Sequence, residues 1–169
     1  MEQLLDIKLQ TPLRVYSADD KLIAEFGEKR RAPVTIEQIP TIQLHAFMAA
    51  EDARFYEHFG VDFKGLMRAA IELISTGEIQ SGGSTITMQV AKNYFLSRDR
   101  TFIRKFNEIL LALQIERELD KNRIMELYLN KIYLGNRAYG IAAAAQVYYD
   151  KPVTELSLAE MAMLAGLSK

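Results

Sequence analysis

The chain has 169 residues, enough for one domain with a buried core, and its 21 lysines and arginines nearly balance its 22 aspartates and glutamates. This balance excludes a broad basic surface, so we do not expect nucleic acid as a partner. The absence of cysteine excludes disulfides and thiolate metal sites. No segment has the roughly 18 uncharged apolar residues that a membrane-spanning helix needs. A hydrophobic content of 49% still allows an apolar surface that meets a membrane.

The first predicted element is a small β-hairpin. Residues 13–16 and 22–26 are rich in strand-forming side chains and flank a polar turn at residues 17–21. Residues 28–34 have the composition of an exposed linker. We therefore divide the chain into an N-terminal hairpin and linker segment, residues 1–34, and one domain, residues 35–169.

From residue 35 onward the pattern is helical nearly to the end. Capping residues and apolar spacing predict helices over about residues 40–57, 63–77, 85–95, 101–119, 121–134, 140–149 and 158–166. Asp62 can cap the second of these helices, whose apolar face combines Phe63, Leu66, Met67, Ala70, Ile71 and Ile74. The predicted fold class is mainly α with a minor β element.

An acidic pair, Glu51 and Asp52, ends an otherwise apolar helical segment. Glu51, Phe55 and His58 have the spacing i, i+4 and i+7, so we expect them on one helical face. A carboxylate placed there can serve as a general base. A solvated pair at a helix end has the same sequence pattern, so the motif alone leaves both interpretations open.

A glycine turn at residues 80–85 leads into the next helix. The free N–H groups and the dipole at a helix N-terminus favour an anion. Thr85, Gln89 and Lys92 then form one polar stripe at i, i+4 and i+7. The Gly-Lys-Ser/Thr of a nucleotide-binding loop is missing, which excludes that type of site. An ordinary Gly-Ser turn is the alternative.

Two cations precede a glutamate in the following helix. Arg104 and Lys105 lie four and three residues before Glu108. On its own this spacing is typical of a salt-bridge cluster on a solvated helix face.

These motifs occur in a fixed order with two others. In sequence they are Glu51-Asp52-x-x-Phe55-x-x-His58-x-Gly60-x-Asp62, Gly83-Ser84-Thr85-Ile86-Thr87-x-Gln89, Arg104-Lys105-x-x-Glu108, Ile124-x-Glu126-x-Tyr128-Leu129-Asn130 and Ala144-Ala145-x-x-Tyr148. The series resembles the family 51 peptidoglycan glycosyltransferases, the polymerase module of class A penicillin-binding proteins, over about residues 35–169. Met88 and the segment Tyr149-Asp150-Lys151 depart from the residues usual in that family.

The resemblance implies a lysozyme-like helical domain with two lobes. It implies polymerisation of lipid II into β-1,4-linked glycan with inversion and release of undecaprenyl pyrophosphate. Glu51 matches the general base and Glu108 the second essential glutamate. The positions that match substrate-binding residues are Asp52, Phe55, His58, Arg68, Gly83, Ser84, Thr85, Gln89, Lys92, Arg100, Arg104, Lys105, Asn130 and Tyr148.

The same resemblance implies further partners. Magnesium or manganese often assists in the family, and no organic cofactor is expected. The expected ligands are lipid II, the growing glycan and a phosphoglycolipid inhibitor of the moenomycin type. We expect the domain at the periplasmic face of the bacterial inner membrane, with residues 63–79 in the interface. The family's anchor and transpeptidase domain are expected in a longer bifunctional protein, so this chain should not bind penicillin.

Two other classes of protein remain as alternatives. A lysozyme-like muramidase would cut glycan, but a hydrolase has no diphosphate to hold beside a cationic glycine turn. A non-catalytic scaffold would keep the fold only to bind partners, and the presence of both Glu51 and Glu108 argues against it.

Overall fold

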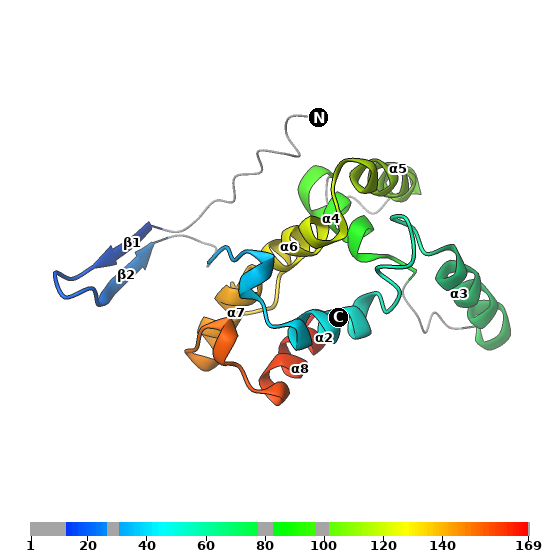
Figure 1. Ribbon diagram of the computed structural model, residues 1–169. Coiled ribbons are helices and arrows are strands. Elements are labelled where there is room, and N and C mark those ends of the chain that lie inside the picture. Colours follow the sequence, from blue (N-terminus) through cyan, green and yellow to red (C-terminus); the bar gives the residue numbers. More distant parts are fainter. Residues whose placement is uncertain (1–12, 27–30, 78–82, 97–101, 169) are drawn as a thin grey trace.

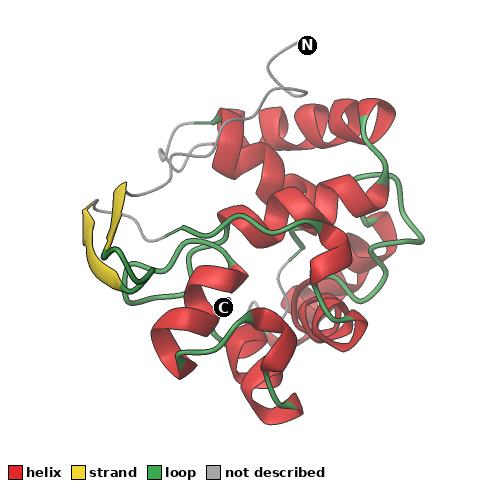
Figure 2. Cartoon of the chain, turned by 60° about the vertical axis from the view of Figure 1, so that its left-hand side comes forward, coloured by secondary structure: helices red, strands yellow, loops and turns green. Residues whose placement is uncertain are grey.

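The computed structural model describes residues 13–26, 31–77, 83–96 and 102–168. The described chain is mainly helical with one hairpin, as predicted (Figures 1 and 2). Its elements are β1 (Leu13–Tyr16), β2 (Leu22–Phe26), the 3-10 helix η1 (Ile36–Gln38), α2 (Thr41–Glu51), α3 (Phe63–Thr76), α4 (Ile86–Phe95), α5 (Phe102–Glu118), α6 (Lys121–Lys131), α7 (Ile141–Tyr149), the 3-10 helix η2 (Val153–Glu155) and α8 (Leu158–Gly166).

The hairpin projects from one side of the helical body (Figure 1). Its strands are antiparallel, with Leu13 opposite Phe26. The turn closes where the N–H of Ser17 donates to the carbonyl of Lys21 over 2.8 Å. The prediction of a hairpin with a polar turn is therefore confirmed.

The segment after the hairpin is packed against the helical body, so the prediction of an exposed linker is wrong for residues 31–34. Arg31 is buried, and its guanidinium lies 5.3 Å from the centre of the Tyr139 ring. The backbone of Val34 makes two hydrogen bonds with the side-chain amide of Asn130, at 2.9 and 2.7 Å. A long-range anchor of this kind has no local sequence signal.

Helix α2 is shorter than the sequence predicts, because it ends at Glu51 and not near residue 57. Asp52 leaves the helical region, with φ −157° and ψ 75°, and residues 53–61 form turns. Within these turns Gly60 has φ +79°, and a Cβ there would lie 2.9 Å from the carbonyl oxygen of Ala112. This close approach to α5 requires glycine.

Helix α6 lies at the centre of the fold and ends at Lys131, earlier than the predicted residue 134. Its residues Ile124, Met125 and Tyr128 have no exposed surface, and they pack in one large cluster with residues of α2, α4, α7 and α8. Figure 2 shows the helices packed together in one body, with the hairpin at its edge. The core thus fixes the ends of α2 and α4, which carry the candidate site.

Candidate active site

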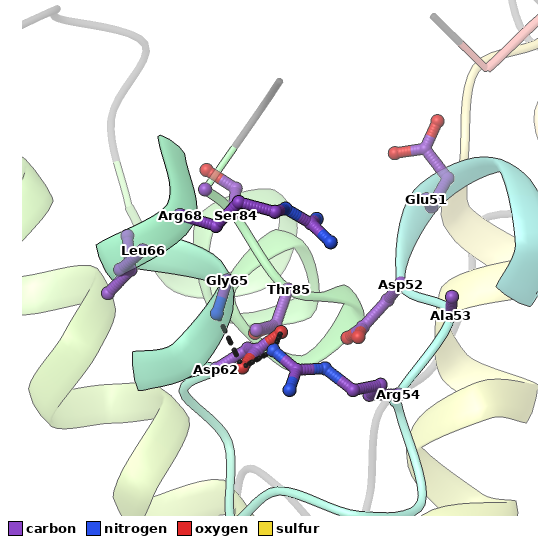
Figure 3. A pocket seen from close by; sticks show the side chains of 11 residues that line it. Glu51, Asp52, Ala53, Arg54, Asp62, Gly65, Leu66, Arg68, Ser84 and Thr85 are labelled. Atoms are coloured by element: carbon purple, nitrogen blue, oxygen red, sulfur yellow. Dashed lines mark hydrogen bonds and ion pairs between the residues drawn. The ribbon is translucent and has the colours of Figure 1, made fainter. Parts of the chain in front are cut away.

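A cavity of about 140 Å³ lies between the end of α2, the beginning of α3 and the segment that leads into α4. Figure 3 shows Glu51 and Asp52 on one side of it and Arg68 and Ser84 on the other. The residues that line it are Glu51, Asp52, Ala53, Arg54, Asp62, Gly65, Leu66, Arg68, Gly83, Ser84 and Thr85. Five of the sequence-predicted site residues apart from Glu51 are in this set, namely Asp52, Arg68, Gly83, Ser84 and Thr85.

Glu51 is the last residue of α2 and is half-buried. Its Oε2 accepts a hydrogen bond of 2.7 Å from Nε2 of Gln89 on α4. Its Oε1 accepts one of 2.5 Å from the hydroxyl of Ser168, just after α8. Three helices therefore hold this carboxylate at the wall of the cavity.

Asp52 is buried, and its contacts join two of the elements that form the cavity wall. Its carboxylate lies 2.9 Å from Nε2 of His58 and accepts a 3.0 Å hydrogen bond from the N–H of Ile86. Because Ile86 is the first residue of α4, Asp52 joins the end of α2 to the beginning of α4. A carboxylate at this position also complements the positive end of the α4 dipole.

The prediction that Glu51, Phe55 and His58 share a helical face is wrong, because α2 ends before Phe55. Phe55 has no exposed surface and packs in the core, with its ring 4.4 Å from Nζ of Lys121. His58 contacts Asp52 instead of the cavity. Both residues support the loop between α2 and α3.

An ion pair that the sequence did not reveal forms another part of the wall. One guanidinium nitrogen of Arg54 lies 2.5 and 2.6 Å from the two carboxylate oxygens of Asp62 (Figure 3). The N–H of Gly65 donates to the same carboxylate over 2.9 Å. Burial alone would raise the pKa of Asp62, but the Gly65 amide and Arg54 outweigh it and lower the pKa. The sequence offered one signal for this ion pair: Arg54 and Asp62 carry opposite charges and lie eight residues apart, at the two ends of one loop.

The second predicted catalytic residue, Glu108, is buried and does not line the cavity. Its Oε2 accepts a 3.0 Å hydrogen bond from Nζ of Lys105, and its Oε1 lies 3.5 Å from Arg104. Lys105 also donates to the hydroxyl of Ser84 over 2.6 Å. Glu108 therefore reaches the cavity through Lys105 and Ser84.

Thr85 caps α4, as predicted. Its hydroxyl oxygen accepts from the N–H of Met88 over 3.1 Å and donates to the carbonyl of Gly60 over 2.6 Å. Gly83 lies against α3, where a Cβ would come within 2.5 Å of Cδ2 of Leu66. The approach to α4 is therefore closely packed against α3 and the preceding loop.

Three of the predicted cations differ in their surroundings. Lys92 lies one turn after Gln89 on the same helix, and it makes no ion pair in the part of the chain that the structure describes. Arg68 lines the cavity but is mostly exposed, with Nε 3.8 Å from Glu72. Arg100 lies outside the described residues.

Asn130 and Tyr148 do not line the cavity. Besides holding Val34, the amide of Asn130 donates to the carbonyl of Glu126 over 3.0 Å. The hydroxyl of Tyr148 donates to the carbonyl of Leu134 over 2.9 Å. The structure gives both residues contacts that stabilise the fold and none with the site.

The site residues do not fit a resident metal ion. Among the described residues, no three histidine, aspartate or glutamate side chains are grouped so that they could hold one. Glu108 is flanked by Arg104 and Lys105, and Asp62 is paired with Arg54. Cationic side chains thus already pair with both of these carboxylates.

The geometry supports transfer of a group with an anionic leaving group. Glu51 has the position of a base that accepts a proton at the cavity wall. The opposite wall includes Ser84, whose hydroxyl accepts a hydrogen bond from Lys105, and a cation in that place stabilises negative charge. Together these features are typical of an enzyme that carries out acid–base chemistry beside an anion.

Comparisons with known proteins agree with this class. The family described as transglycosylase matches residues 19–169. The chain is 66% identical to penicillin-binding protein 1A of Pseudomonas aeruginosa over all of its 169 residues, and 57% identical to that of Escherichia coli K12 over 98% of its length. A crystal structure of penicillin-binding protein 1A from Haemophilus influenzae aligns with 96% of the chain and 14% of its own, at 30% identity and a TM-score of 0.44.

The chain belongs to the transglycosylase family. It spans 21% of the length of the Pseudomonas aeruginosa relative and 20% of the Escherichia coli one. The predicted resemblance is confirmed, and the match covers the whole helical part of the chain together with all of strand β2.

Sequence reasoning missed three residues of the site, Arg54, Asp62 and Ser168. The carboxylate of Asp62 was predicted only to cap α3. Ser168 is 117 residues from Glu51 in the chain, and no local pattern indicates that the two side chains meet.

Proposed function

We propose that this domain polymerises lipid II into peptidoglycan strands, with Glu51 as the general base. The observation that carries the proposal is the position of Glu51: a half-buried carboxylate at the wall of a cavity whose far side carries Arg68 and Ser84. Family membership supports the reaction class.

In this mechanism Glu51 accepts the proton of the 4-hydroxyl of the acceptor GlcNAc. The hydroxyl oxygen forms a bond to the anomeric carbon of the donor, whose bond to the pyrophosphate oxygen breaks with inversion. The electron pair leaves with undecaprenyl pyrophosphate. Because pyrophosphate is a good leaving group, cations can replace the carboxylic acid that a glycosidase needs.

Lys92, Arg100 and Lys105 are the proposed partners of the diphosphate. Lys105 is fixed beside the cavity by Ser84 and Glu108, at 2.6 and 3.0 Å. Glu108 acts in this proposal as a positioning residue, because it contacts cations and not the cavity. Charge-assisted contacts of this type are about twice as strong as neutral ones.

The proposal assigns no step to a metal ion, since the donor set does not fit one. Magnesium or manganese enters it only as an ion carried by the donor diphosphate, because such ions usually combine few carboxylates with substrate phosphates. Treatment of the free domain with EDTA should therefore leave its melting temperature unchanged. A drop in melting temperature would indicate a resident ion and contradict this part of the proposal.

The α3 and α5 surfaces suit a membrane interface. The exposed large apolar side chains include Phe63, Met67, Ile71 and Ile74 on α3, and Ile103, Phe106 and Leu110 on α5. No helix within the described ranges is both long enough and apolar enough to traverse a bilayer. We propose that these two faces lie in the outer layer of the bacterial inner membrane, where the lipid-linked donor enters.

Vesicle flotation tests the membrane proposal. Replacing Met67 and Ile71 with serine should reduce binding to anionic vesicles, while the melting temperature changes little because both side chains are exposed. Leu158→Ser is the matched control, because Leu158 is equally exposed but lies on α8. Equal vesicle binding by the double variant and the control would refute the proposal.

Labelled lipid II tests the reaction itself. Gel analysis in detergent should show glycan strands that disappear on addition of a phosphoglycolipid inhibitor of the moenomycin type. Incubation with preformed glycan separates the muramidase alternative, which would shorten the strands. Absence of polymer from a folded protein would contradict the proposal. A transpeptidase domain and cell-wall synthesis partners are proposed for the longer protein, on the model of the relatives.

A further inference from the structure

The hydroxyl of Ser168 has two acceptors within reach. It lies 2.5 Å from Oε1 of Glu51 and 2.7 Å from the carbonyl oxygen of Ala165. A serine hydroxyl carries a single proton, so it can donate to only one of them at a time. The geometry therefore gives the hydroxyl hydrogen of Ser168 two positions, one toward Glu51, the proposed base, and one toward Ala165 at the end of α8.

Parallel packing of α2 and α8 brings Ser168 to this place. Nε2 of Gln43, buried on α2, donates to the carbonyl of Met161 on α8 over 3.1 Å. Gln43 and Glu51 lie eight residues apart, and their partners Met161 and Ser168 lie seven apart. The two contacts follow the same order along both helices and are separated by nearly the same rise, at about 1.5 Å per residue. The helices therefore run side by side in the same direction, and their C-terminal ends meet.

A buried tyrosine lies beneath the same carboxylate. Tyr128 on α6 has no exposed surface, and its hydroxyl makes no hydrogen bond of normal geometry among the described residues. Burial, followed by the charge of Glu51, raises the pKa of Tyr128 above its ordinary value. The Ser168 hydroxyl acts on the pKa of Tyr128 in the opposite direction, without outweighing burial. Tyr128 therefore keeps its proton, and the hydrogen bonds found at Glu51 come from Gln89 and Ser168.

We propose that Ser168 is a positioning residue that holds Glu51 toward the cavity and follows its protonation. It donates to the ionised carboxylate before reaction. After Glu51 accepts the proton of the acceptor hydroxyl, Ser168 rotates to donate to Ala165 and its oxygen accepts from protonated Glu51. No proton is gained or lost in this exchange. The inference rests on the proposed role of Glu51 as the base.

A simple helix cap is the competing explanation of the Ser168–Ala165 contact. Ser75 provides a matched control, because its hydroxyl also donates to a carbonyl three residues earlier, Glu72, over 3.0 Å. The variants are therefore Ser168→Ala, which removes the donor, Ser168→Thr, which keeps it, and Ser75→Ala, which removes only a cap.

The first measurement is polymerisation of lipid II. We expect Ser168→Ala to lower kcat about tenfold with little change in KM, since a hydrogen bond to a charged group is lost. Ser168→Thr should restore kcat to within about twofold, and Ser75→Ala should leave it unchanged. Equal losses in Ser168→Thr and Ser168→Ala, or a loss in KM alone, would overturn the proposal.

The second measurement needs no activity. The ¹³C carboxyl signal of Glu51 at pH 7, assigned by its disappearance in Glu51→Gln, should move in Ser168→Ala and stay in place in Ser168→Thr and Ser75→Ala. An unmoved signal in Ser168→Ala refutes the contact. If the signal moves in Ser168→Ala but the wild-type chain makes no polymer, the contact is supported and the proposed function is refuted.

Discussion

The two glutamates of the site lie in contrasting surroundings. Glu51 is half-buried at the cavity and receives hydrogen bonds from the neutral donors Gln89 and Ser168. Glu108 is 3% exposed and contacts the cations Arg104 and Lys105. A carboxylate among neutral donors beside a cavity can exchange a proton with a substrate. A carboxylate between two cations instead fixes them in place, so the same residue type serves two purposes.

The sharpest test of this comparison is Glu51→Gln. We expect polymerisation to fall by roughly 10²–10⁴-fold, because the amide cannot accept the proton. The free energy of unfolding should change by no more than about 1 kcal/mol, since glutamine keeps the shape of the side chain and its oxygen can still accept from Gln89. Rates with labelled lipid II and thermal melts measure the two quantities. Near-normal polymerisation by the folded variant would remove Glu51 from the mechanism.

Glu108→Gln tests the second glutamate of the comparison, which is proposed to hold two cations in place. It leaves Arg104 and Lys105 without their carboxylate, so both polymerisation and stability should decrease, the latter by about 1–3 kcal/mol. Glu118→Gln is the control, because Glu118 is exposed on the same helix. Loss of activity at unchanged stability would indicate that Glu108 acts on the substrate directly.

Lys92→Ala tests a cation on α4, the helix whose Gln89 binds Glu51. Affinity for a diphosphate-bearing donor and for the phosphoglycolipid should fall about tenfold, because a charge-assisted contact to phosphate is lost. Affinity for soluble glycan should stay constant, since it has no diphosphate. Arg100→Ala is expected to change affinity in the same direction. Calorimetric titration with both kinds of ligand measures this, and a similar loss for glycan would point to misfolding.

The smallest expected effect concerns the wall of the cavity at Asp62. Its folded pKa is lowered, so its contribution to stability is present above the unfolded pKa of about 3.9 and is lost as the pH falls through the folded value. Asp62→Asn should therefore destabilise the domain by about 1–2 kcal/mol at pH 7 and by less near pH 2. Thermal melts across this range, with exposed Glu57→Gln as control, check it. A loss independent of pH would contradict the assignment.

The parts of the fold that the sequence predicted well are those with local causes. Asp120, Thr85 and Ser157 each accept a hydrogen bond from an N–H of the helix that they precede. The predicted beginnings of α4, α6 and α8 agree with the structure because such caps involve neighbours in the chain. The predicted end of α2 was wrong, because Asp52 leaves the helix to bind His58 and the N–H of Ile86.

The sequence by itself determined the family, the mainly α fold and the place of Gln89 and Lys92 on one helix, because ordered motifs and helical spacing are properties of the chain. Only the tertiary structure decided which groups meet. Gln89 and Ser168 reach Glu51 from 38 and 117 residues away, and Lys105 reaches Ser84 from 21. These contacts depend on how the helices pack around α6, and packing over such separations leaves no periodic signal in the sequence.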